Sequence, residues 1–211
     1  MARHHSYTNY IKASDSLFSY KKTDLQSVNP KILPDYPDDI YDYQYLNRVL
    51  AIGPKIPDLE DWNRDLSNAL KLLGPKYQAN VILVFTTYSL ETHSNEILTK
   101  WKGGNKNDII VFLHTPNYPQ IDAVKVVSLS YDDIFNVKLR DDLLALGKSS
   151  RQDVIEIVSK DVEANFKRRH MKDFEYLADD IPISPWIIFF SILFGIVSTG
   201  ITTKIVLDGD Y

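Results

Sequence analysis

The chain contains no cysteine. That absence excludes a disulfide framework, a thiolate metal site and a thiol nucleophile, but it leaves the redox compartment open. An excess of basic residues is missing too, because 24 Lys and Arg stand against 28 Asp and Glu, for a net charge of −4. A nucleic-acid-binding protein concentrates Lys and Arg well beyond its acidic residues. We therefore expect no nucleic-acid partner.

Established catalytic motifs are also missing. The sequence has no phosphate-binding loop, no dinucleotide fingerprint, no HExxH zinc motif and no GxSxG nucleophile turn. The first twenty residues hold no apolar run of signal-peptide length, so the chain is not expected to enter early secretion. These absences favour an interaction or accessory protein over an enzyme.

A long uncharged segment is the most informative feature that is present. The 23 residues "IPISPWIIFFSILFGIVSTGITT" contain no charge and extend from position 181 to 203. Such a length crosses the hydrocarbon core of a bilayer, which needs about 20 helical residues. A buried helix of a soluble protein is usually shorter and polar on one face. We predict a single-pass transmembrane helix at 181–207, a tail anchor, with 208–211 as a short tail.

The basic residues that flank this segment predict its orientation. Four of them precede it, Lys167, Arg168, Arg169 and Lys172, whereas Lys204 alone follows its centre. Basic residues near a membrane span stay on the cytoplasmic side. We therefore expect a membrane protein whose large N-terminal part is cytoplasmic.

Small residues recur every fourth position within the segment. They are Ser191, Gly195, Thr199 and Thr203, which a helix places along one stripe. Such stripes let two helices approach closely in lipid. The alternative is that the stripe has no partner, since small residues are common in membrane spans. A homo-oligomer through this helix is one hypothesis.

Residues 56–178 have the pattern of an α/β domain. Apolar positions from Leu59 to Leu73 step by three and four, which is typical of an amphipathic helix. Two buried strands are predicted at 80–85 and 108–113, and the short helix between them makes the strands parallel. A third strand at 124–130 follows a proline-containing turn, so it should be antiparallel. Two more helices follow, and together they predict a small mixed sheet flanked by helices.

The Gly-rich loop "WKGGNKND", which leads into the second strand, carries a family resemblance. Over about residues 58–130, the order of elements and this loop resemble the TPM domain, with Asp108 at the position of the family's loop Asp. Ile109 stands where the family usually has Gly, and the Gly-x-Gly turn beyond the third strand is missing. The resemblance implies an α/β/α fold and a membrane-anchored accessory module. Because family members are linked to calcium and weak phosphatase activity, it also implies an alternative, a membrane-tethered, cation-dependent phosphatase-type hydrolase.

One candidate metal site lies at the loop's edge of the sheet. An antiparallel third strand would bring Asp132 and Asp133 beside Asn107 and Asp108. Oxygen-rich turns of this kind suit a hard cation such as calcium. Turn and helix-capping chemistry explains the same residue types, and we rank it ahead of a calcium site.

A second candidate site lies at the opposite edge. Glu91 and His93 follow the first strand and His114 follows the second, and open α/β sheets usually bind ligands at this end. The trio would suit zinc binding or proton transfer. The alternative is that these are ordinary solvated loop residues.

The first 55 residues show little apolar periodicity. Within them, "PDYPDDIYDYQY" at positions 34–45 is rich in Tyr and Asp. Tyrosine offers a large contact area with little loss of entropy. We predict an extended N-terminal arm that packs on its own domain, or alternatively binds a protein partner.

Overall fold

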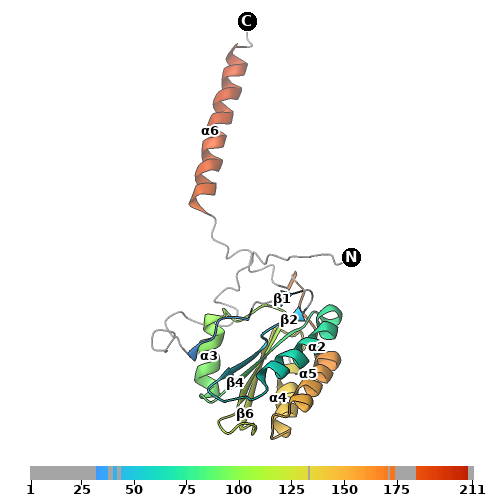
Figure 1. Ribbon diagram of the computed structural model, residues 1–211. Coiled ribbons are helices and arrows are strands. Elements are labelled where there is room, and N and C mark those ends of the chain that lie inside the picture. The colour runs from blue at the N-terminus through green and yellow to red at the C-terminus, as the bar shows by residue number, and fades with distance from the viewer. Residues whose placement is uncertain are drawn as a thin grey trace. The chain divides into compact units, whose positions relative to one another are not determined.

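The computed structural model describes residues 32–37, 40, 41, 44–132, 134–170, 172, 173 and 184–208. The chain divides into two units, an α/β domain up to Asp173 and a C-terminal unit that contains helix α6 (Pro185–Asp208) (Figure 1). Each unit is described separately below.

The domain is built on a four-stranded sheet in the order β3-β4-β5-β6. The strands are β3 (Val49–Ile52), β4 (Asn80–Thr86), β5 (Asp108–His114) and β6 (Ala123–Ser128). The first three are parallel, and β6 is antiparallel to β5. The predicted mixed sheet, with a parallel pair and an antiparallel third strand, is confirmed. A separate two-stranded pair joins β1 (Ile40–Tyr41) to β2 (Gln44–Tyr45).

Strand β3 is an addition to the expected sheet. Its residues fall in the stretch that the sequence assigned to the N-terminal arm, yet they pair in parallel with β4, Val49 opposite Leu83. The run "VLAI" is only four residues long, and its partner lies more than thirty positions away. A short strand at a sheet edge is stabilised by that distant partner, which local periodicity does not show.

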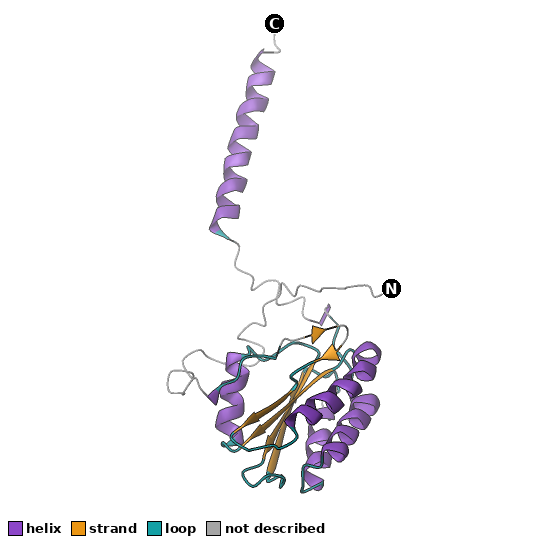
Figure 2. Cartoon of the chain, in the orientation of Figure 1, coloured by secondary structure: helices purple, strands orange, loops and turns teal. Residues whose placement is uncertain are grey.

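Helices cover both faces of the sheet, giving three layers (Figures 1 and 2). Three of them pack on one face, α2 (Leu59–Tyr77), α4 (Phe135–Ala145) and α5 (Arg151–Asn165), and α3 (Leu90–Lys100) packs on the other. The crossover helices α2 and α3 therefore lie on opposite faces, although both connections move the same way across the sheet. The two crossovers must have opposite hands, so one is the uncommon left-handed form.

Strand β4 shows why these segments read as uninterrupted apolar runs. Val81, Leu83 and Phe85 face the layer of α2, α4 and α5, while Ile82 and Val84 face α3. Because helices cover both faces, every position of the strand is buried.

Helix α2 forms because its apolar residues fall on one stripe. Trp62, Leu66, Leu70 and Leu73 are all buried against the sheet. The Trp62 ring meets Phe85 edge-on, with ring centroids 5.0 Å apart. Each such side chain contributes about 1.5–3 kcal/mol by leaving water, so this stripe is a principal anchor of the core.

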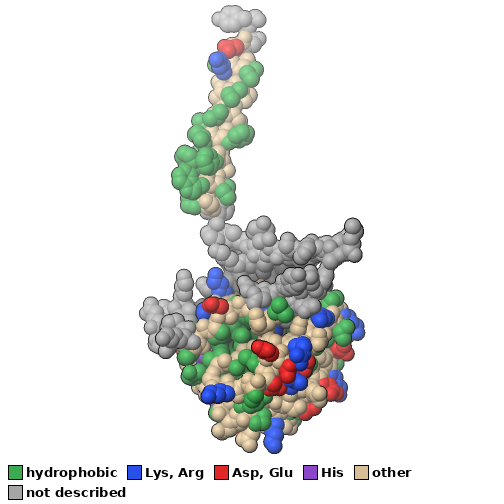
Figure 3. All heavy atoms as spheres, viewed as in Figure 1, with side chains coloured by type: hydrophobic (Ala, Val, Ile, Leu, Met, Phe, Trp, Pro, Cys, Tyr) green, Lys and Arg blue, Asp and Glu red, His purple; other side chains and the backbone are tan. Residues whose placement is uncertain are grey.

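Helix α6 belongs to the second unit. None of its side chains is buried, and the apolar ones run along its visible face (Figure 3). Every buried hydrophobic residue described in the chain occurs at or before Phe166. The α/β domain therefore contains its whole described core, and a chain that ends at residue 178 is expected to fold on its own.

Candidate functional site

The loop that introduces β5 leads to a buried polar network. Asp108, the first residue of β5, is 2% exposed. Its Oδ1 accepts a hydrogen bond from the Asn80 amide at 2.8 Å. Its Oδ2 accepts bonds from the Tyr36 hydroxyl at 2.9 Å and from the Asn105 backbone N–H at 2.7 Å. Three donors thus converge on one carboxylate.

Arg48 extends this network. Its side chain is 1% exposed, and its Nε donates to Asn80 Oδ1 at 3.0 Å. Asn80 therefore joins a buried guanidinium to a buried carboxylate. Burial raises the pKa of Asp108, and the hydrogen bonds and the Arg48 charge oppose that shift only in part. Burial, followed by the Asp108 charge, also raises the pKa of Tyr36, so its hydroxyl stays a neutral donor.

Two glycines allow the loop to approach this carboxylate. Gly103 and Gly104 have φ angles of 80° and 78°, in the left-handed region that favours glycine. A Cβ on Gly104 would stand 2.8 Å from Asp108 Oδ2. The Gly-rich character of the loop is thus explained by backbone geometry and close packing.

The end of α3 and the start of the loop also hold residues 33–36. The Trp101 indole N–H donates to the Pro34 carbonyl at 3.0 Å, and its ring lies edge-on to Tyr36 at 5.6 Å. Lys100 donates to the Leu33 carbonyl at 2.9 Å and pairs with Asp35 at 2.7 Å. This described piece of the Tyr/Asp-rich stretch packs on its own domain. Tyr43 and residues 38, 39 and 42 lie outside the described residues.

The described residues of the predicted calcium site have partners of different kinds. Asn107 accepts the Asn80 backbone N–H at its carbonyl, at 2.8 Å. Asp132 Oδ1 accepts the Ile134 N–H at 3.0 Å, which forms a turn before α4. Asp133 lies outside the described residues. Within the described residues, no group of three or more His, Cys, Asp or Glu is placed to hold a metal. Of these contacts, the Asp132 bond is a turn contact and the Asn107 bond joins the loop to the start of β4, and a calcium site stays a prediction.

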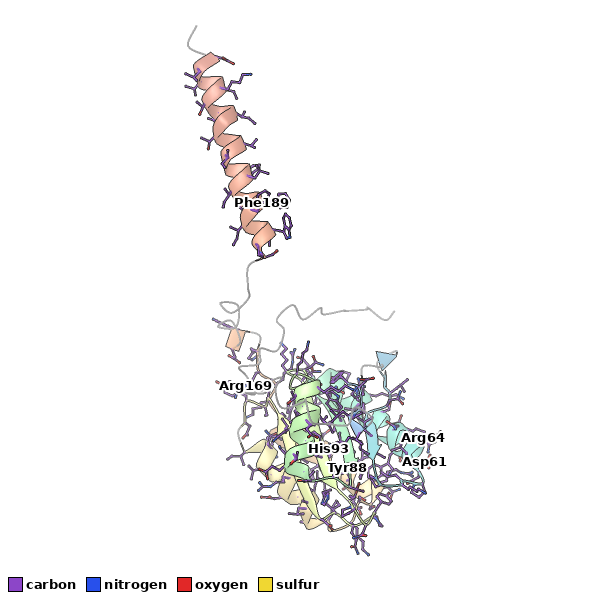
Figure 4. All side chains as sticks on the ribbon, turned by 90° about the vertical axis from the view of Figure 1, so that its left-hand side faces the viewer. Asp61, Arg64, Tyr88, His93, Arg169 and Phe189 are labelled. Atoms are coloured by element: carbon purple, nitrogen blue, oxygen red, sulfur yellow. The ribbon has the colours of Figure 1, made fainter. Side chains whose placement is uncertain are left out.

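Glu91, His93 and His114 were predicted to lie together at the second edge. In the structure, each of the three contacts different groups. His114 ends β5, where its Nε2 lies 3.4 Å from the Thr87 carbonyl. His93 is 2% exposed, and its ring lies tilted by 44° against that of Tyr88, with ring centroids 5.0 Å apart (Figure 4). Its Nδ1 lies 3.6 Å from Glu96, and neither ring nitrogen has a hydrogen-bond partner among the described residues. Burial lowers the pKa of His93, against the effect of Glu96.

Glu91, the third residue of that trio, lines an open groove of about 360 Å³ beside β6. The lining includes Leu90, Lys125, Asn136, Val137 and Arg140. Lys125 donates to Ser94 Oγ and Asn95 Oδ1, both at 2.8 Å, so its charge is held by α3. The groove lining mixes apolar and charged side chains.

Another titratable cluster joins α4 to α5. Asp161 is buried, and Lys138 lies 2.5 Å from it and 2.6 Å from Asp142. Burial raises the pKa of Asp161, while the Lys138 contact opposes the shift. This bridge was not foreseen from the sequence, in which the three residues look like ordinary charges on exposed helix faces. It ties two helices together.

Comparison with known proteins gives no family for this chain. No protein-family model matches it, and searches of curated proteins and of solved structures find no match. The resemblance to the TPM domain therefore stays a prediction, and function must be argued from the geometry above.

Proposed function

We propose that the chain is a single-pass, tail-anchored membrane protein whose α/β domain serves a membrane-associated assembly as an interaction or accessory module. One observation carries the proposal. Helix α6 has 24 residues, a mean hydropathy of 1.9 over its apolar window, and no buried side chain. Its length of about 36 Å exceeds the hydrocarbon core of about 30 Å.

The polar groups of α6 are suited to lipid. The hydroxyls of Thr199, Thr202 and Thr203 donate to carbonyls one turn earlier, at 2.7 to 2.8 Å. A helix satisfies its own backbone groups, and these bonds satisfy the threonine hydroxyls as well. In water the same helix would expose one continuous apolar surface. Soluble proteins usually expose apolar side chains singly or in much smaller patches. Insertion into a bilayer removes that surface from water.

The flanking charges support a cytoplasmic domain. Lys167, Arg168 and Arg169 belong to the described end of the α/β domain, whereas Lys204 is the one basic residue in α6. The positive-inside rule then keeps the domain in the cytoplasm.

An accessory role is favoured over the hydrolase alternative by how the polar residues are used. Both oxygens of Asp108, the residue that the TPM resemblance singles out, already accept hydrogen bonds inside the domain. A general base or metal ligand needs an oxygen that is open to substrate or ion. The accessory role also agrees with an α/β domain that has its own hydrophobic core and is followed by a membrane anchor.

The anchor is tested by expressing the full chain beside a chain that ends at residue 178. After alkaline carbonate extraction, the full chain should stay in the membrane pellet and the truncated chain should be soluble. A double variant, Ile196→Lys with Val197→Lys, should no longer sediment with the membranes, because each central lysine opposes insertion by about 2.5–3.5 kcal/mol. Ser184→Lys, just before the helix, is the matched control and should stay membrane-bound. Extraction of the full chain would overturn the proposal.

The hydrolase alternative has a separate assay. Residues 1–178 are incubated with a panel of phosphate monoesters, with and without divalent cations. We expect no turnover. Metal-dependent turnover that is lost in Asp108→Asn would replace the accessory role with the hydrolase function.

A further inference from the structure

A basic and apolar patch lies where the α/β domain ends. We define it by Lys106, Lys167, Arg168 and Arg169 with Tyr131 and Ile134. Two hydrogen bonds join its segments: the Tyr131 N–H donates to the Lys167 carbonyl at 2.7 Å, and the Lys167 N–H donates to the Ser130 side-chain oxygen Oγ at 3.2 Å. Figure 4 shows Arg169 at the end of the domain away from Tyr88. The patch is therefore a fixed feature of the fold.

The cations of the patch have no acidic partner in the part of the chain that the structure describes. None of the four forms an ion pair among those residues. The Nε atoms of Arg168 and Arg169 lack a hydrogen-bond acceptor there. Burial, and then the charge of Arg168, lower the pKa of Lys106. Like charges thus lie close together, a condition that an external anion would relieve.

Among the described residues, the acids that lie near these cations in the sequence form no ion pair with them. Asp132 and Asp173 use their carboxylates to accept backbone N–H groups, those of Ile134 and His170. They lower the net positive charge of the area without forming ion pairs with the patch.

Large apolar side chains project beside these cations. Tyr131 is 62% exposed and Ile134 is 71% exposed. The Arg169 guanidinium lies over the Tyr131 ring, 5.8 Å from its centroid. Aromatic rings flanked by basic groups are well suited to the boundary between lipid headgroups and hydrocarbon.

We infer that this patch binds anionic lipid headgroups on the surface of the membrane. The inference rests on the proposed anchor. Trp186 stands 17 positions after Arg169, and an extended chain of that length spans at most about 60 Å. The anchor would therefore confine the patch near the cytoplasmic leaflet, whose lipids are anionic. Each basic residue near such a surface strengthens binding about fivefold.

The experiment uses residues 1–178, which contain the whole described core, in a vesicle sedimentation assay. Vesicles of phosphatidylcholine with about 30% phosphatidylserine should bind the domain, and pure phosphatidylcholine vesicles should not. Raising the ionic strength to about 0.5 M should abolish binding because it screens exposed charges. Free inorganic phosphate, at the concentration of the lipid headgroups, should not compete.

Two triple variants distinguish the effect of the patch on vesicle binding from the effect of the domain's net charge. Lys167→Gln with Arg168→Gln and Arg169→Gln should weaken binding about a hundredfold. The matched control, Lys55→Gln with Lys71→Gln and Lys148→Gln, removes the same charge from exposed sites elsewhere in the domain and should change binding less than about threefold. A third variant, Tyr131→Ser with Ile134→Ser, should also weaken binding. Thermal unfolding of each variant checks that the fold is kept.

Equal binding to both vesicle types, or equal losses in the two triple variants, would overturn the inference. Competition by inorganic phosphate would point to a free-phosphate site in place of a lipid surface. The assay does not contain α6, so its failure would leave the anchor standing. Extraction of the full chain by carbonate would overturn the anchor on which the inference rests, whereas vesicle binding by residues 1–178 would still test the patch by itself.

Discussion

At the scale of single residues, Asp108 organises the largest buried polar network described in the domain. Asparagine at this position would keep one acceptor oxygen but would point an amide donor toward existing donors such as the Tyr36 hydroxyl or the Asn105 N–H. We expect Asp108→Asn to lower the free energy of unfolding by about 1–3 kcal/mol, because a buried polar group is left unsatisfied. Chemical denaturation of residues 1–178 measures this.

The control for that change is Asp132→Asn. Asp132 accepts one backbone N–H in a turn, which asparagine can also do, so the loss should stay below about 0.5 kcal/mol. The same samples decide the calcium hypothesis. Because the oxygens of Asp108 are already bonded, we expect millimolar calcium to leave the melting temperature unchanged. A rise of several degrees that Asp108→Asn removes would establish the calcium site instead.

His93 gives a prediction about pH. Burial lowers its pKa in the folded state, so the unfolded chain binds a proton first as pH falls through about 6.5. The stability of the domain is therefore full above that pH and falls as pH drops toward the folded pKa, with a limiting slope of about 1.4 kcal/mol per pH unit. His93→Phe keeps a ring against Tyr88 and removes this titration.

The measurement is the melting temperature between about pH 7.5 and about pH 5.5, a range that brackets the ordinary histidine pKa. The variant should lose less stability on acidification than the natural chain. His170→Gln, at an exposed position, is the control and should keep the natural slope. Identical slopes for all three proteins would show that His93 does not set the acid sensitivity.

The residues of the Asp108 network show the limit of sequence reasoning at this scale. Asp108 was singled out by the TPM resemblance and as a candidate calcium ligand. Its partner Tyr36 is 72 positions away, and Asn80 links it to Arg48. No local pattern marks a buried arginine or a tyrosine that bonds a distant carboxylate, so the network could not have been assembled from the sequence.

At the scale of elements, the loop after α3 can be tested through its glycines. Gly104 and Gly147 both have a positive φ, of 78° and 65°. An added Cβ at Gly147 meets nothing within 4 Å, whereas at Gly104 it stands 2.8 Å from Asp108 Oδ2. That carboxylate is held by three donors and cannot move aside freely.

We therefore expect Gly147→Ala to lower the free energy of unfolding by about 1–2 kcal/mol through backbone strain alone. Gly104→Ala adds the displacement of the Asp108 carboxylate, for a total of about 2–4 kcal/mol. Denaturant titration of both variants checks the difference. Equal losses would mean that the loop relaxes around the new methyl group, and that close packing on Asp108 is not why a glycine stands there.

The helices and strands also show which parts of the fold can be predicted from the local sequence. Strands β4 and β5 were predictable because apolar runs covered on both faces are hard to mistake, and the proline-containing turn before β6 correctly indicated an antiparallel partner. The face that each helix covers was not predictable. Both faces of β4 are equally apolar, and the usual right-handed rule would place α2 and α3 on the same side.

At the scale of the whole molecule, the two units differ in how their apolar side chains and polar groups are accommodated. The α/β domain encloses a hydrophobic core, and hydrogen bonds within it join many of its described buried polar groups. Helix α6 bonds its own threonine hydroxyls and buries no side chain. The stripe of Ser191, Gly195, Thr199 and Thr203 is exposed along it, so association with a second copy stays a hypothesis. A domain with its own hydrophobic core, followed by a helix long and apolar enough to cross a membrane, is the arrangement expected of a tethered module.

Orientation in the membrane is the prediction that involves the full chain. Four basic residues precede α6, and Lys204 stands near its end, so the domain should remain in the cytoplasm. Protease added to sealed cells that express the full chain should leave the domain intact, and the same protease should digest it once the cells are permeabilised. Changing Lys167, Arg168, Arg169 and Lys172 to Gln, with two lysines added after residue 208, reverses the charge bias. A fraction of that variant should become protease-sensitive in sealed cells. Digestion of the unaltered domain in sealed cells would establish the opposite orientation and would remove the cytoplasmic leaflet as the lipid surface that the patch can reach.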